Sequence, residues 1–324
     1  MTSLPRIVIL DGATLNPGDN PWTEIQSLGT VEVFGLSTTD ELESRLADAD
    51  IAITNKVTLG GDLLRRLPGL KFITVTATGY DCVDVAAARE LGIPVSNVPT
   101  YGTDSVSQFA FAQLLELCHR VSLHDAAVRN GRWQTCGSFS FWLTPQIELA
   151  GLTMGIIGFG RIGRRTGALA NAFGMRVLAA DQWQHDPPDY DGFEWADADR
   201  VASEADAVLL HCNLTDESRG MIDASFLARM KRSAFLINAS RGPLVDEAAL
   251  AAALNEDRIA GAATDVVSIE PIRDDNPLLG AKNMLITPHM AWSTLAARKR
   301  MTSTTAANIR DFLAGSPQNV VNSK

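Results

Sequence analysis

The sequence has few cysteines, no long apolar run and a shortage of positive charge. Its four cysteines, Cys82, Cys118, Cys136 and Cys212, form no CxxC pair and have no histidine at zinc-finger spacing. We therefore expect neither a disulfide nor a bound metal, which fits a reducing compartment. No stretch approaches the ~18 apolar residues of a membrane-spanning helix. The first ten residues, MTSLPRIVIL, lack the apolar core of a secretory signal, so we expect a cytoplasmic protein that does not bind membranes.

The shortage of positive charge excludes further classes of partner. The chain has 28 Lys and Arg against 38 Asp and Glu, a net charge of −10. Such a chain is poorly suited to nucleic acid or to an anionic membrane, so a bound anion would need a local arginine or a helix N-terminus. What is present is a core-forming composition, 46% hydrophobic and 20% charged over 324 residues. That length is typical of about two domains.

Short β-branched runs alternate with helical patterns along most of the chain. The alternation predicts an α/β fold in which helices cover parallel sheets. In the first third, the runs expected as strands are 7–10, 31–34, 50–54, 71–76 and 93–98. A second series follows at 152–157, 176–180, 207–211, 234–238, 260–267 and 284–286.

Three helical patterns matter for the organisation. Residues 40–49 form one, with Asp40 as its expected N-cap, and residues 293–313 form the last. Between them a long helix is expected after Gly102 and Thr103. Its apolar face comprises Val106, Ala110, Leu114, Leu117 and Val121, at spacings of four, four, three and four.

A glycine-rich turn follows the strand at 152–157. Gly158, Gly160 and Gly163 form the pattern GxGxxG, and a helical pattern continues over 164–173. The first glycine allows a tight turn, the second lets a pyrophosphate approach the backbone, and the third lets helix and strand pack closely. The alternatives are a glycine-rich turn that binds no ligand and a methyltransferase loop.

An acidic residue favours the dinucleotide interpretation. The next predicted strand is followed by Asp181, 18 residues after Gly163. A carboxylate there accepts hydrogen bonds from both ribose hydroxyls and repels a 2′-phosphate, so NAD is favoured over NADP. Strand, turn, helix and acid together predict an NAD site.

Three further strands are followed by residues suited to acid–base chemistry. Arg241 follows the strand at 234–238, Glu270 follows 260–267, and His289 follows 284–286 after Pro288. An arginine can hold a carboxylate and polarise a keto oxygen, a histidine can transfer a proton, and a nearby glutamate favours the protonated imidazole. These are the needs of a 2-keto acid reductase. The alternative is that Glu270 and Arg241 form only a surface ion pair.

These motifs together resemble the D-2-hydroxyacid dehydrogenases. The matching segments are GIIGFGRIG (155–163), INASRGPLVDEAAL (237–250), DVVSIEP (265–271) and TPHMAW (287–292). The resemblance implies two Rossmann- or flavodoxin-like parallel-sheet domains, with a cofactor domain inserted into a substrate domain. Residues 1–101 and 291–324 would form the substrate domain, and residues 102–290 the NAD-binding domain.

The resemblance also implies a set of site residues. Arg241, Glu270 and His289 would be catalytic, with His289 as the acid and base, and Asp265 would lie near the nicotinamide carboxamide. The residues expected to bind the cofactor are Thr103, Gly158, Gly160, Arg161, Ile162, Gly163, Asp181, Cys212, Ala239, Ser240, Arg241, Asp265 and His289. Those expected to contact the substrate are Thr78, Gly79, Trp142, Arg241, His289 and Trp292.

Other segments resemble the glycerate dehydrogenases, also called hydroxypyruvate reductases. These segments are ATGYDCVD (77–84), YGT (101–103) and the tryptophan after His289. The likeness implies reduction of hydroxypyruvate or glyoxylate with NADH, and backbone amides around Thr78 and Gly79 that hold the substrate carboxylate. It also implies a homodimer, in which the aromatic segment with Phe141 and Trp142 closes the neighbouring site.

One departure keeps an alternative open. Asn213 stands where many members of the family have proline, near the expected adenine edge. The Cys-Asn-Leu sequence at 212–214 and Trp292 also resemble the C-terminal-binding corepressors, which share this fold. The alternative function is therefore an NAD-sensing binding protein. A corepressor would usually carry extra tails, whereas ~11 residues follow the last predicted helix, and no regulatory domain of the long phosphoglycerate dehydrogenases is expected.

Overall fold

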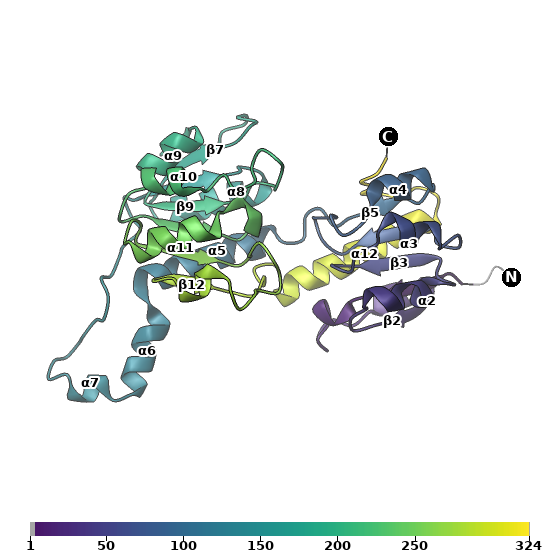
Figure 1. The fold of residues 1–324 in the computed structure, drawn as a ribbon, viewed down its shortest axis with the longest axis horizontal. Coiled ribbons are helices and arrows are strands. Elements are labelled where there is room, and N and C mark those ends of the chain that lie inside the picture. Colours follow the sequence, from purple (N-terminus) through teal and green to yellow (C-terminus); the bar gives the residue numbers. More distant parts are fainter. Residues whose placement is uncertain (1–3, 324) are drawn as a thin grey trace. The chain divides into compact units, whose positions relative to one another are not determined.

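Two parallel β-sheets, each flanked by helices, organise residues 4–323, the part of the chain that the computed structural model describes (Figure 1). Residues 4–102 and 293–323 form one unit, and residues 103–292 form the other. The second unit is inserted in the sequence of the first, so the predicted α/β fold class is confirmed.

The first unit contains a five-stranded sheet in the order β2-β1-β3-β4-β5, with every pairing parallel. Its strands are β1 (Arg6–Ile9), β2 (Thr30–Val33), β3 (Ile51–Thr54), β4 (Phe72–Val75) and β5 (Val95–Ser96). Its helices are α1 (Thr23–Gln26), α2 (Leu42–Leu46), α3 (Gly61–Arg65), α4 (Val85–Glu90) and α12 (Leu295–Leu313). Strands β3 and β4 are buried along their whole length, which explains their continuous apolar sequence. The last helix, α12, returns the chain to this sheet and packs against β4 and α1.

The prediction of Asp40 as an N-cap is wrong. The chain instead makes a 3-10 turn, η2 (Thr39–Glu41), before α2 begins. The Thr38 backbone N–H donates to the Glu41 carboxylate at 2.8 Å, so Thr38 and Glu41 form a capping box. A threonine three residues before a glutamate is the sequence pattern of a capping box. With Thr38 as the N-cap, the turn begins at Thr39 and Asp40 lies inside it.

The second unit contains a seven-stranded parallel sheet in the order β12-β11-β10-β9-β6-β7-β8. Its strands are β6 (Thr153–Ile157), β7 (Arg176–Ala180), β8 (Phe193–Trp195), β9 (Ala207–Leu210), β10 (Phe235–Asn238), β11 (Gly261–Thr264) and β12 (Met284–Ile286). The sequence interpretation missed β8, a short edge strand whose Phe193 and Trp195 rings pack on Phe159, with centroids 5.0 and 5.4 Å away. The strand order reverses between β6 and β9, where doubly wound sheets place their ligands.

Helices cover both faces of this second sheet. Buried residues of α5 (Thr103–His119) and α8 (Arg161–Ala172) pack on one face. Those of α9 (Ala198–Glu204), α10 (Ala224–Arg229) and α11 (Glu247–Asn255) pack on the other. The helix expected over 164–173 begins at Arg161 instead, because Gly160 with its extended backbone is the N-cap.

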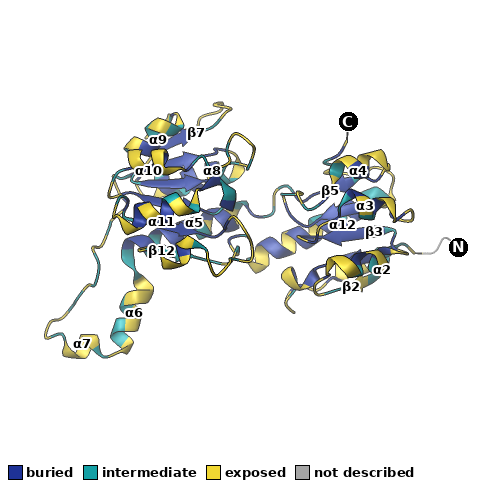
Figure 2. Ribbon diagram, in the orientation of Figure 1, coloured by how far each residue is buried: buried dark blue, intermediate teal, exposed yellow. Residues whose placement is uncertain are grey.

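A largely exposed arm leaves the second unit after α5 (Figure 2). It comprises α6 (Val121–Arg129), α7 (Arg132–Thr135) and the irregular segment 136–149, and no residue of either helix is buried. The predicted continuation of the α5 apolar face to Val121 is wrong, since Arg120 has a left-handed backbone that ends α5. The Val121 side chain is exposed.

Candidate active site

The glycine turn between β6 and α8 has the geometry of a dinucleotide site. Gly158 has a φ of +93°, and a Cβ there would overlap the backbone of His211 and Cys212. A Cβ on Gly163 would overlap the Gly158 carbonyl oxygen, so the first and third glycines are required for packing. A Cβ on Gly160 would meet nothing within 4 Å. The second glycine therefore leaves open space above the start of α8, where a pyrophosphate would approach the backbone.

Asp181 is held at the edge of this turn. Its Oδ2 accepts a hydrogen bond from the Phe159 backbone N–H at 2.6 Å, and its Oδ1 accepts one from the Trp183 N–H at 3.0 Å. These bonds orient the carboxylate at the glycine turn. Each carboxylate oxygen can accept more than one hydrogen bond, so ribose hydroxyls can still bind there. The residues present therefore fit the adenosine end of an NAD molecule.

Other predicted cofactor residues gather on neighbouring loops. Arg161 and Ile162 form the first turn of α8, and Thr103 begins α5, which packs against α8. The Ser240 hydroxyl donates to the Cys212 carbonyl at 2.7 Å, which joins the loops after β9 and β10, and Ala239 precedes Ser240. Asn213 lies in the loop after β9, where its carbonyl accepts a hydrogen bond from the Ser218 hydroxyl.

Asp265 lies at the carboxyl end of β11 and organises the segment that carries His289. Its side chain is buried and accepts hydrogen bonds from the Thr287 hydroxyl at 2.6 Å, the Met290 N–H at 2.9 Å and the Ala291 N–H at 2.8 Å. Burial raises the pKa of this carboxyl, and these hydrogen bonds oppose the rise. The carboxylate thus shapes the chain on both sides of His289.

His289 and Glu270 form a hydrogen-bonded pair. The His289 Nδ1 lies 2.6 Å from the Glu270 Oε2, so a carboxylate there requires the ring proton on Nδ1. The His289 side chain is 26% exposed, and its other ring nitrogen, Nε2, is the one that could exchange a proton with a ligand. Its backbone is left-handed, with φ +52°, and its N–H donates to the Asp265 carbonyl at 2.7 Å. An unfavoured backbone held by its surroundings is frequent at functional sites.

Arg241 stands after β10, the strand next to β11. Its guanidinium donates from one nitrogen to the Ser240 carbonyl at 2.8 Å, and its own carbonyl accepts from the Asn238 side chain at 2.9 Å. Strands β10, β11 and β12 are adjacent and parallel. The structure therefore brings the loops of Arg241, Glu270 and His289 to one edge of the sheet, and it pairs the glutamate with the histidine.

The predicted substrate residues are distributed over both units. Thr78 and Gly79 follow β4 in the first unit, where the Asn97 amide donates to the Thr78 carbonyl at 2.7 Å. Trp292 follows the Asp265-bound segment in the second unit. Trp142 lies on the arm and is 69% exposed. Its substrate contact stays a prediction that requires a second subunit.

Two supporting residues on α5 were missed by the sequence interpretation. The Gln113 amide donates to the Thr287 hydroxyl at 3.1 Å, and the Ser105 hydroxyl donates to the Ala291 carbonyl at 2.6 Å. Both side chains are buried, and their hydrogen bonds hold one residue on each side of His289 in the sequence. Their spacing of eight places them on one helix face, but nothing local distinguishes them from ordinary helix positions.

Among the described residues, 4–323, no helix is both long and apolar enough to cross a membrane. The same part of the chain contains no cluster of three or more histidine, cysteine or acidic residues arranged to hold a metal ion.

The chain is similar in sequence to known dehydrogenases and reductases. Residues 111–291 match a family model described as "D-isomer specific 2-hydroxyacid dehydrogenase, NAD binding domain". The chain is 46% identical to a hydroxypyruvate reductase of Blautia hydrogenotrophica, over 98% of this chain and 99% of that protein. It is 40% identical to a glycerate dehydrogenase of Methylorubrum extorquens, over 88% and 89% of the two chains.

A solved structure shows the same architecture. It is a D-lactate dehydrogenase from Aquifex aeolicus complexed with NAD and lactic acid, with a TM-score of 0.84 and 26% sequence identity. The alignment covers 98% of this chain and 99% of that one, so the likeness extends over both units.

Proposed function

The chain belongs to the D-isomer-specific 2-hydroxyacid dehydrogenase family, and we propose that it reduces hydroxypyruvate to D-glycerate, or glyoxylate to glycolate, with NADH. It is an NAD-dependent oxidoreductase that acts on a CH–OH group. The observation that carries the proposed reduction of a 2-keto acid is the Glu270–His289 pair, 2.6 Å apart, on loops beside that of Arg241. The choice of hydroxypyruvate or glyoxylate is supported by the two relatives named above. The two relatives named above are enzymes by name, and neither favours the corepressor alternative.

The proposed chemistry assigns one task to each side chain. Bound NADH supplies a hydride for the carbonyl carbon of the keto acid. His289 gives a proton from Nε2 to the carbonyl oxygen, while the Glu270 carboxylate orients the ring and stabilises the imidazolium. Arg241 holds the substrate carboxylate and polarises the keto oxygen, for which a planar guanidinium with several donors is suited. In the reverse direction, neutral His289 accepts the proton.

We assign the substrate domain to residues 1–101 and 291–324, and the NAD-binding domain to residues 102–290. The family model over 111–291 supports the second assignment. In the first unit, backbone N–H groups around Thr78 and Gly79 are proposed to bind the substrate carboxylate. The anchoring of Thr78 by Asn97 supports this role, because it keeps the loop after β4 in place.

We further propose that the protein is a homodimer in the cytoplasm. The arm of residues 121–149 exposes Trp133, Phe139 and Trp142, with 51%, 90% and 69% of their surfaces accessible. Large aromatic side chains gathered on a projecting segment are typical of a protein interface. In a dimer the arm would cover a second copy, and Trp142 would approach the partner's substrate. Light scattering of the protein and of a Trp133→Ser/Phe139→Ser variant tests the dimer, which the double substitution should weaken.

The activity is tested by the loss of NADH absorbance with a panel of 2-keto acids. Hydroxypyruvate and glyoxylate should be consumed, and His289→Ala should lose on the order of 10²–10⁴-fold in kcat. The matched control is His119→Ala, at the end of α5, which should behave as the wild type. If NADH binds but no keto acid is reduced, the enzymatic proposal fails and the NAD-sensing alternative is favoured.

A further inference from the structure

One side chain of α11 fastens the loop that carries Glu270 at two points. The Glu247 Oε1 accepts a hydrogen bond from the Ser268 backbone N–H at 2.7 Å, and the Glu247 Oε2 accepts one from the Asn276 side-chain amide at 3.0 Å. Ser268 and Asn276 flank Glu270 on its two sides in the sequence. Glu247 therefore holds both sides of this loop against the start of α11.

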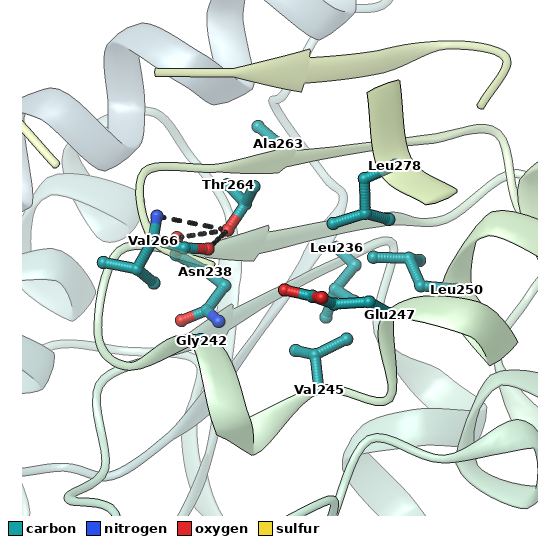
Figure 3. A pocket seen from close by; sticks show the side chains of 10 residues that line it. All are labelled: Leu236, Asn238, Gly242, Val245, Glu247, Leu250, Ala263, Thr264, Val266 and Leu278. Carbon is teal, nitrogen blue, oxygen red and sulfur yellow. Dashed lines mark hydrogen bonds between the residues drawn. The ribbon is translucent and has the colours of Figure 1, made fainter. Parts of the chain in front are cut away.

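Glu247 lines a pocket whose other lining residues are apolar or uncharged. Figure 3 shows the pocket that it lines, between β10, β11, α11 and the 3-10 turn η4 (Pro277–Gly280). Leu236, Val245, Leu250 and Leu278 contribute much of the lining, and Glu247 is its charged member. The Glu247 side chain is partly buried, and the loop gives each of its carboxylate oxygens one donor.

The hydrogen bonds continue from this clamp to the proposed catalytic pair. Val267, next to Ser268, donates its backbone N–H to the Glu270 Oε1 at 3.2 Å. The other oxygen of Glu270 contacts the His289 ring. A displacement of Ser268 would move Val267 with it and turn the Glu270 carboxylate away from the imidazole.

We propose that Glu247 is a positioning residue that orients Glu270 toward His289 by clamping Ser268 and Asn276. The inference rests on the proposed function, in which Glu270 and His289 act as a pair. A competing role for Glu247 is to cap α11. That helix already has an N-cap in Asp246, whose side chain accepts the Ala249 N–H at 2.9 Å, so the Glu247 carboxylate remains available for the loop.

An exchange of donor and acceptor tests the clamp. In Glu247→Gln, one side-chain oxygen can still accept the Ser268 N–H, but the new NH2 group faces the NH2 group of Asn276. In Asn276→Asp, two carboxylates face each other. We expect each single variant to lose about tenfold in kcat, the scale of one hydrogen bond to a charged group, with an unchanged KM for NADH.

The Glu247→Gln/Asn276→Asp pair restores one donor opposite one acceptor and should recover kcat to within about threefold of wild type. The Asn276→Asp substitution also keeps a side-chain oxygen for the Leu278 N–H, which the Asn276 side chain accepts now.

A double-mutant cycle with Glu270→Gln separates positioning from a structural role. If Glu247 acts through Glu270, then adding Glu247→Gln to Glu270→Gln should lower kcat no further. Factors that multiply in this cycle, or wild-type kcat in Glu247→Gln, would overturn the positioning role. Wild-type kcat in Glu270→Gln would refute the role of Glu270 beside His289, and the positioning role of Glu247 with it, whereas the absence of keto-acid reduction in the unmodified protein would refute the proposed function.

Two controls protect the test from folding effects. Glu256→Gln removes the same charge just beyond the end of α11, at an exposed position, and should leave kcat and the melting temperature unchanged. Glu247→Asp keeps the charge near the helix start but shortens the reach to the loop. It should therefore lose kcat even if Glu247→Gln folds poorly, and an active Glu247→Asp enzyme would contradict the clamp.

Discussion

Replacing Gly242 with alanine should separate two loops of the proposed active site. Gly242 follows Arg241 directly, and its backbone lies against Val267 and Ser268 on the loop that carries Glu270. An added Cβ would lie 2.5 Å from the Ser268 nitrogen and closer still to the Val267 carbonyl group, whereas ordinary contact begins at 3.4 Å. Because these are backbone atoms, no side-chain rotation can relieve the overlap.

The size of the overlap sets the expected loss. The two backbones must move apart by roughly 0.9 Å to reach ordinary contact with the Ser268 nitrogen, and by more to clear the Val267 carbonyl group, which is closer. Overpacking of this kind costs about 1–3 kcal/mol of stability. A misplacement of ~1 Å between catalytic groups can cost on the order of 10²-fold in rate. We therefore expect Gly242→Ala to fold with a lowered melting temperature and to lose about 10²-fold in kcat.

The assay is the loss of NADH absorbance at saturating hydroxypyruvate, accompanied by thermal unfolding of the same samples. The matched control is Gly280→Ala in the same unit, where an added Cβ would meet nothing within 4 Å, and it should retain wild-type turnover. A Gly242→Ala enzyme with wild-type kcat and melting temperature would refute the packing argument. A lower melting temperature with wild-type kcat would refute only the link between this contact and catalysis.

Three other side chains give further predictions. Asp181→Ala should weaken NADH use and relax discrimination against NADPH, because it removes ribose hydrogen bonds and a charge that repels the 2′-phosphate; an unchanged ratio of kcat/KM for the two cofactors would contradict this. Arg241→Lys should lose most activity although the charge is kept, since an ammonium lacks the planar fork, and near-normal kcat/KM would contradict the role of Arg241. The His211 Nε2 lies 3.0 Å from the Thr166 hydroxyl oxygen. Burial lowers the pKa of His211 to about 4. The unfolded chain then binds a proton that the folded chain does not, so stability should fall by on the order of 2 kcal/mol from pH 7 to pH 5, and urea midpoints should show a smaller fall in His211→Gln.

Much of the fold could be predicted from local sequence because its elements are encoded locally. Buried parallel strands such as β3 and β4 need continuous apolar runs, and the glycine turn needs glycine where a Cβ would overlap backbone. The errors occurred where neighbouring elements compete. Thr38 and Glu41, rather than Asp40, cap the turn before α2. The left-handed backbone of Arg120 ends α5, so Val121 does not continue its apolar face.

For the site, the sequence by itself determined which chemical groups stand at the strand ends. Parallel strands collect their carboxyl ends at one edge, so Arg241, Glu270 and His289 could be expected near one another from their positions alone. Tertiary structure decided the pairing. Side-chain contacts depend on the path of each loop and on residues distant in sequence, and this is why the hydrogen bond of Glu270 to His289 and the Glu247 clamp became visible only in the folded chain.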